Sequence, residues 1–148
     1  LGSAWAGLRG IGPACAFAVA AMAATALRVP EVPPALAEAG VAATLLVLAG
    51  MLLSRRLPGM PGALALAVAA GLLHGHAFGE AVIGAEATPL LAYLAGLAVI
   101  QALMLVLSYR LAVWVQSEHP ARVPWSRRIA ASLLAAAGTA AMAGALAG

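Results

Sequence analysis

The residues of this chain that could carry chemistry are few, and most of them lie between positions 38 and 86. His74 and His76 are two residues apart, and Glu80 follows four residues after His76. Glu38 precedes this group and Glu86 follows it. Imidazole and carboxylate groups together suit a divalent first-row metal such as nickel, cobalt or zinc. These residue types make a metal ion the first ligand to consider.

The spacing of the two histidines restricts how such a site can form. On a regular helix His74 and His76 lie about 200° apart around the axis and cannot share a face. His76 and Glu80, four residues apart, can share one. The sequence therefore leaves two arrangements open: either the helix unwinds near Gly75, or the two imidazole rings meet different partners.

A purely structural interpretation of the same segment also stays open. Gly71, Gly75 and Gly79 form a ridge of small residues that lets two helices approach closely. A histidine in a membrane can simply hydrogen-bond a neighbouring helix, and Gln101 could do the same or line a path. Glu38 lies early in its apolar segment, where a helix N-terminus favours an acid.

The composition excludes a water-soluble globule. Of the 148 residues, 64% are hydrophobic and only 9% are charged, and the mean hydropathy is +1.02. Soluble domains are nearer half apolar and a quarter charged, whereas disordered chains need low hydrophobicity and high charge. The basic residues are all arginines, scattered between apolar runs rather than forming a stripe, so nucleic acid is not the expected partner. The expected partner is the lipid bilayer.

Five apolar segments are long enough, or nearly so, to cross a bilayer as helices of about 20 residues. They run over about 11–27, 35–53, 62–77, 89–113 and 129–147. Proline-, glycine- and arginine-containing linkers separate them. We expect an all-α, polytopic transmembrane helix bundle forming a single integral membrane domain over 1–148. We interpret Leu1 to Leu8 as the inner end of a further, sixth helix.

The arginines predict the orientation of the bundle. With five crossings, one side of the membrane holds all but one of them, and the other holds only Arg28. The larger set is Arg9, Arg55, Arg56, Arg110, Arg122, Arg127 and Arg128. Because arginine-rich loops stay inside, this side is expected to be cytoplasmic, with the C-terminus outside a bacterial inner membrane. The candidate acids and the two histidines of the central segment then all fall at the outer side.

Nothing in the sequence indicates an enzyme. The chain has no Asp, no plausible serine–histidine–acid set and no phosphate-binding glycine loop. The His-Glu-x-x-His run of zinc-dependent membrane proteases is also missing. We therefore expect no catalytic residue.

The segment from Leu73 to Glu80 resembles a conserved block of the HupE/UreJ family, small membrane proteins associated with hydrogenase and urease gene sets. The block reads histidine–glycine–(histidine or aromatic)–alanine–x–glycine–glutamate. Pro33-Pro34 ahead of Glu38, and the segment from Ala92 to Gly96, also resemble the family. The resemblance implies a six-span permease for nickel, sometimes cobalt, that feeds metalloenzyme maturation. The transported Ni²⁺ or Co²⁺ would then meet a ligand set drawn from His74, His76, Glu38 and Glu80.

The chain departs from the family pattern at two places. The histidine–proline and aspartate–histidine motif of the first mature helix in the family does not occur in residues 1–148, which begin where that helix is expected to be ending. Leu105 stands where the family commonly has a histidine, with Gln101 one turn before it, and leucine cannot bind a metal. The alternative function is therefore an accessory or structural subunit of a larger membrane protein complex, with a degenerate metal site.

Overall fold

The structure is a computed structural model that describes residues 2–27, 33–55, 58–80 and 86–147. These residues form five α-helices and one short 3₁₀ helix, and no strand occurs among them. The elements are α1 (Gly2–Leu27), α2 (Pro34–Ser54), α3 (Met60–Glu80), α4 (Ala87–Glu118), η1 (Pro120–Arg122) and α5 (Val123–Ala147). The prediction of an all-helical bundle is confirmed. Gly2 to Leu8 belong to α1 itself, continuous with its apolar stretch Ile11–Leu27, so the interpretation of this segment as the inner end of a separate, sixth helix is wrong; Leu1 lies outside the described residues.

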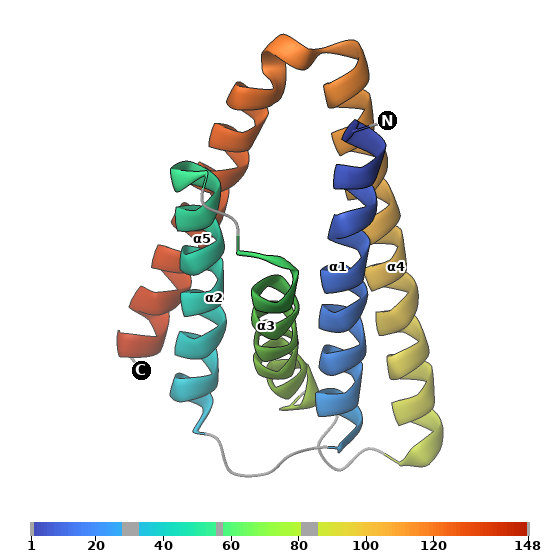
Figure 1. The fold of residues 1–148 in the computed structure, drawn as a ribbon. Helices are drawn as coiled ribbons and strands as arrows, with labels where there is room; N and C mark the ends of the chain where they lie inside the picture. Colours follow the sequence, from blue (N-terminus) through green and yellow to red (C-terminus); the bar gives the residue numbers. More distant parts are fainter. Residues whose placement is uncertain (1, 28–32, 56–57, 81–85, 148) are drawn as a thin grey trace.

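The helices run alternately up and down, with α3 between α1 and α2 (Figure 1). Packing is most extensive between α1 and α3 and between α2 and α5, whereas α4 is attached mainly through α1. The start of α1 and the turn between α4 and α5 lie at one end of the bundle, at the top of Figure 1. The starts of α2 and α4 lie at the other end, as the alternation of loops used for the arginine count requires.

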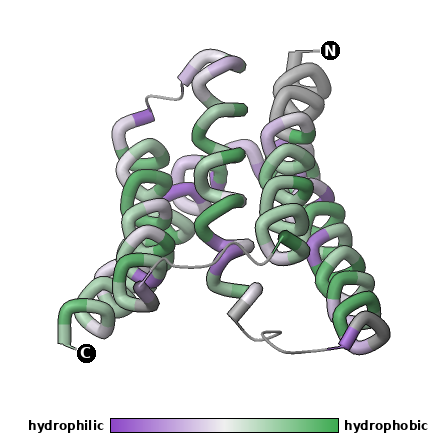
Figure 2. Tube along the Cα trace, turned by 90° about the horizontal axis from the view of Figure 1, so that it is seen from below, coloured by the Kyte–Doolittle hydropathy of each residue, from purple (hydrophilic) through white to green (hydrophobic). Residues whose placement is uncertain are grey.

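The surface of the bundle is suited to lipid. Four helices among the described residues are long and apolar enough to cross a membrane: Ala35–Ser54, Met60–Gly79, Pro89–Glu118 and Pro120–Ala147. Residues Ile11–Leu27 of α1 form a shorter apolar stretch. Large side chains such as Leu91, Val99 and Leu133 are about two-thirds exposed. Figure 2 shows hydrophobic residues predominating along the helices. Such a surface is stable in hydrocarbon and not in water.

The interior is built from small residues. Among the residues whose burial the structure describes, the buried hydrophobic side chains are all alanines: Ala20, Ala21, Ala24, Ala37, Ala42, Ala49, Ala131 and Ala145. Thr25 is the largest fully buried side chain in the described part of the chain. Helices in lipid gain little from burying apolar surface, so close backbone approach and interhelical hydrogen bonds hold them together.

The helix boundaries follow local backbone chemistry rather than hydropathy alone. The helix α4 continues five residues beyond the apolar window expected to end at Val113, and it ends at Glu118. His119 then leaves the helical region (φ −135°, ψ 56°), because the residue before a proline, here Pro120, disfavours helical backbone. Similarly, Arg55 ends α2 in the left-handed conformation that commonly closes helices (φ 57°).

Candidate functional site

The central helix α3 is fixed against α1 by its glycine ridge. A Cβ atom added at Gly71 would overlap the backbone oxygen of Phe17, and one at Gly75 would overlap the backbone of Ala21. A Cβ at Gly79 would lie 3.7 Å from the Cα atom of Thr25, in ordinary contact. The glycines therefore bring the two helix backbones close together, which side chains of any size at positions 71 and 75 would prevent.

A buried hydroxyl group holds the same seam. The Thr25 Oγ1 atom lies 2.8 Å from the carbonyl oxygen of Ala21, in its own helix, and 2.9 Å from the carbonyl oxygen of Gly75 in α3. Its single hydrogen can be donated to either oxygen. We define the α1–α3 seam as Phe17, Ala21 and Thr25 packed against Gly71, Gly75 and Gly79.

The opposite side of α3 faces α2. Leu73 packs against Gly40, where a Cβ atom would lie 2.9 Å from the Leu73 Cδ2 atom. The helix is continuous from Met60 to Glu80, so it does not unwind at Gly75. Since Gly75 faces α1 and Leu73 faces α2, the helical repeat places His74 and His76 on opposite flanks of α3. The two imidazole rings therefore meet different surroundings.

His74 is half-buried on one flank and is oriented by its neighbours. Its Nδ1 atom lies 2.9 Å from the carbonyl oxygen of Ala70, which can only accept, so Nδ1–H is the donor. In the neutral ring this leaves Nε2 with the lone pair. The rings of Phe17 and Phe78 meet the imidazole edge to face, at centroid distances of 5.2 and 6.5 Å. Metal-binding histidines are commonly oriented by such a second hydrogen bond.

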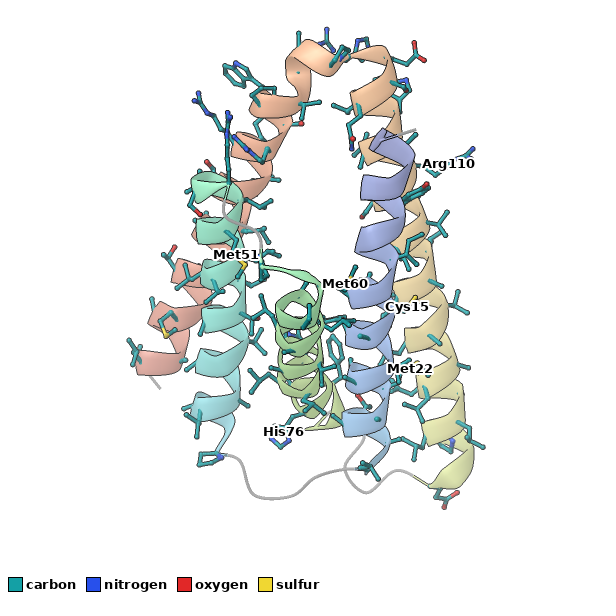
Figure 3. All side chains as sticks on the ribbon, viewed as in Figure 1. Cys15, Met22, Met51, Met60, His76 and Arg110 are labelled. Atoms are coloured by element: carbon teal, nitrogen blue, oxygen red, sulfur yellow. The ribbon has the colours of Figure 1, made fainter. Side chains whose placement is uncertain are left out.

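His76 differs from His74 because one nitrogen atom of its ring lacks a hydrogen-bond partner in the described part of the chain. Its Nε2 atom is buried and has no hydrogen-bond partner among the described residues. Figure 3 places the ring at the lower end of the bundle, near the end of α3. A buried polar atom without a partner costs about 1–3 kcal/mol. Such an atom is a free donor or acceptor for a ligand.

The acids of the candidate site are only partly placed. Glu38 lies in the second turn of α2, at the same end of the bundle as the end of α3, and it is exposed. Glu86 is exposed immediately before α4. Glu80 is the last residue of α3, and its side chain lies outside the described residues. No three His, Cys or acidic side chains come together within the described ranges to hold a metal ion.

Two polar residues of α4 behave differently from each other. Both amide atoms of Gln101 are buried, yet neither has a partner in the described part of the chain. The interhelical hydrogen bond considered for this residue is therefore not made there. Tyr93, which the sequence analysis did not single out, donates its hydroxyl hydrogen to the carbonyl oxygen of Phe78 at 3.3 Å. The sequence signal that could have identified Tyr93 is its position near the start of an apolar segment.

Long apolar helices, a small-residue interior and an apolar exterior define a multi-pass helical membrane protein. A family model described as HupE / UreJ protein matches residues 2–141. The chain belongs to the HupE/UreJ family. The comparisons with curated proteins and with solved structures found no match.

Proposed function

We propose that this protein binds nickel or cobalt ions and moves them through the membrane. The observation that carries this proposal is the buried, unpartnered Nε2 atom of His76 within an apolar bundle. A neutral imidazole nitrogen is a good ligand for first-row divalent metals and a poor neighbour for hydrocarbon. A passing metal ion would satisfy it. The metal is the cargo here, and we assign the chain no catalytic step.

His74 supports the same function from the other flank of α3. Its Nδ1–H donates to the Ala70 carbonyl oxygen, which leaves Nε2 as the ligating atom. Because the two rings lie about 200° apart, we propose that they hold the ion in succession rather than together. Two weak, separate sites suit transport, since an ion must leave each site as readily as it enters.

The carboxylates near the same end of the bundle suit capture of a cation. Glu38 and Glu86 are exposed there, and we place Glu80 with them. Negative charge at an entrance raises the local concentration of cations. We propose that this end faces the outside of a bacterial inner membrane, with the arginine-rich end in the cytoplasm and the C-terminus outside.

The orientation can be tested with single cysteines. The exposed Cys15 is first replaced in the variant Cys15→Ser. Gly59→Cys then probes the α2–α3 turn and Glu86→Cys the start of α4. A membrane-impermeant maleimide applied to intact cells is expected to label position 86 and not position 59. Labelling at position 59 alone would show that the topology is the reverse of the one proposed and that the carboxylates do not face the outside.

Transport is tested by uptake of radioactive nickel in cells expressing the protein. We expect His74→Ala and His76→Ala each to lower uptake, and the double variant to lower it at least about tenfold. The matched control is His119→Ala, because this histidine lies in the turn between α4 and η1, against Trp114. Unchanged uptake in the double variant, at wild-type protein levels, would reject transport.

That negative outcome would favour the accessory-subunit function. Co-purification in a mild detergent then becomes the deciding experiment. A stable, stoichiometric larger membrane protein would support the accessory role. A lone monodisperse protein would count against it.

A further inference from the structure

A cavity of about 480 Å³ lies between α1, α2 and α3, on the His74 flank of the central helix. Three helical stripes line it. The stripe on α1 is Pro13, Ala14 and Phe17. The stripe on α2 is Thr44, Leu45, Leu48 and Met51. The third is Ala63, Leu66, Ala67, Ala70 and His74 of α3, with Pro58 just before that helix. Its volume falls within the range of small-molecule sites.

The chemistry of the walls is almost uniform. Apart from His74 and Thr44, every lining side chain is apolar. The Thr44 hydroxyl already donates to the carbonyl oxygen of Val41, at 2.7 Å. His74 uses Nδ1–H on the Ala70 carbonyl oxygen, so Nε2 is the acceptor that its ring can still offer. The cavity thus combines an apolar slot with one imidazole acceptor at one end.

The length of the slot along α3 is comparable to half the thickness of the hydrocarbon core of a membrane. From Ala63 to His74 the stripe on α3 rises by eleven residue steps, or roughly 16 Å at 1.5 Å per residue. Half of the hydrocarbon core is about 15 Å thick. His74 lies six residues before the end of α3 at Glu80, which puts the acceptor about 9 Å below that end.

We propose that the cavity binds the hydrocarbon chain of a membrane amphiphile that ends in a hydroxyl group. The hydroxyl hydrogen is donated to Nε2 of His74, and the chain extends along the α3 stripe toward Pro58. A saturated or isoprenoid long-chain alcohol has this chemistry. A molecule of the same length without a hydroxyl hydrogen fills the slot equally well but loses the hydrogen bond.

The test uses photoreactive, alkyne-tagged hexadecanol and its methyl ether, each incorporated in vesicles that contain the full-length protein. We expect the alcohol to label the cavity residues about fivefold more strongly than the ether, as one hydrogen bond implies. His74→Phe keeps an aromatic ring against Phe17 and Phe78 but removes the acceptor. In that variant the two probes should label equally. Equal labelling of the wild-type protein by both probes would overturn the proposal.

A second pair of variants tests whether the cavity is the site. Ala67→Phe fills the middle of the slot and should abolish labelling by both probes. The matched control is Ala69→Phe, on an exposed part of the same helix that does not line the cavity, and it should label as the wild type does. Wild-type labelling of Ala67→Phe would also overturn the proposal. If Ala67→Phe does not fold, Ala63→Phe blocks the other end of the stripe.

The alcohol and a nickel ion would compete for the same atom, Nε2 of His74, so each is tested without the other. Ala67→Phe leaves both imidazole rings in place, so it is expected to lose alcohol labelling and to keep nickel uptake. The labelling experiments contain no metal, and their results hold whether or not His74 and His76 carry nickel.

Discussion

The face of α3 that packs in the α1–α3 seam differs from the two flanks of the same helix in how its polar groups are satisfied. In the seam, Gly71 and Gly75 allow backbone-to-backbone packing, and the Thr25 hydroxyl is satisfied. On the flanks, His74 borders a cavity and the Nε2 atom of His76 has no partner among the described residues. The glycine ridge and the Thr25 hydroxyl attach α3 to α1, and neither contact uses the ring nitrogen atoms of the histidines. Residues not required for packing are free to bind.

The largest expected effect comes from breaking the seam. Gly75→Leu places a side chain where the backbone of Ala21 lies, and we expect a loss of about 3 kcal/mol of stability. Thermal unfolding in detergent, followed by size-exclusion chromatography, measures it. Gly96→Leu in α4 is the control, because a Cβ atom there meets nothing within 4 Å. Equal melting temperatures for the two variants would show that the seam is not close-packed.

The next effect has the opposite sign and concerns a flank. His76→Leu removes a buried polar atom that has no partner, so we expect the free energy of unfolding to rise by about 1 kcal/mol. The same thermal unfolding assay applies. His119→Leu, in the turn after α4, should give no such gain. A clear loss of stability in His76→Leu would mean that the ring makes a structural contact.

A smaller loss is expected when the seam hydroxyl is removed. Thr25→Val keeps the shape of the side chain but loses the hydrogen bond to Gly75, at a cost of about 0.6 kcal/mol. Thr139→Val is the matched control, because its hydroxyl donates only to carbonyl oxygens of its own helix, those of Ala135 and Ala136. If both variants unfold at the same temperature, the interhelical bond contributes nothing.

The smallest effect is predicted for His74→Phe. The phenyl ring keeps the edge-to-face contacts with Phe17 and Phe78, and the Ala70 carbonyl oxygen loses only an additional donor. We expect a change in the free energy of unfolding within about 0.5 kcal/mol, near the limit of detection for surface-like changes. A loss as large as that of Gly75→Leu would make this flank part of the packing core and end the contrast with the seam.

The sequence predicts the fold well, whereas the surroundings of the candidate site residues could not be predicted from it. The five apolar segments correspond to the five helices, because lipid requires long apolar runs with internally bonded backbone. Hydropathy identifies only the apolar part of a helix, so it does not predict that α4 continues to Glu118. The ridge from Gly71 to Gly79 is visible in the sequence, but its partner helix is not.

The surroundings of the histidines depend on how α3 is rotated against its neighbours. The spacing shows that His74 and His76 cannot share a face, which the continuous helix bears out. It cannot show that Phe17 from α1 contacts His74, or that a cavity adjoins that flank. The contact between Phe17 and His74 joins residues more than fifty positions apart, and helix packing alone determines this contact and the cavity. The metal-ligand set of His74, His76, Glu38 and Glu80 stays a prediction.

The most direct test of the contrast between seam and flanks is nickel uptake by purified protein in sealed vesicles, compared for His76→Leu and Thr25→Val at equal amounts of folded protein. We predict that His76→Leu lowers uptake at least about tenfold although it is more stable than the wild type, and that Thr25→Val keeps most of the uptake despite its lower stability. Full uptake by His76→Leu would contradict the assignment of ion binding to the flanks of α3.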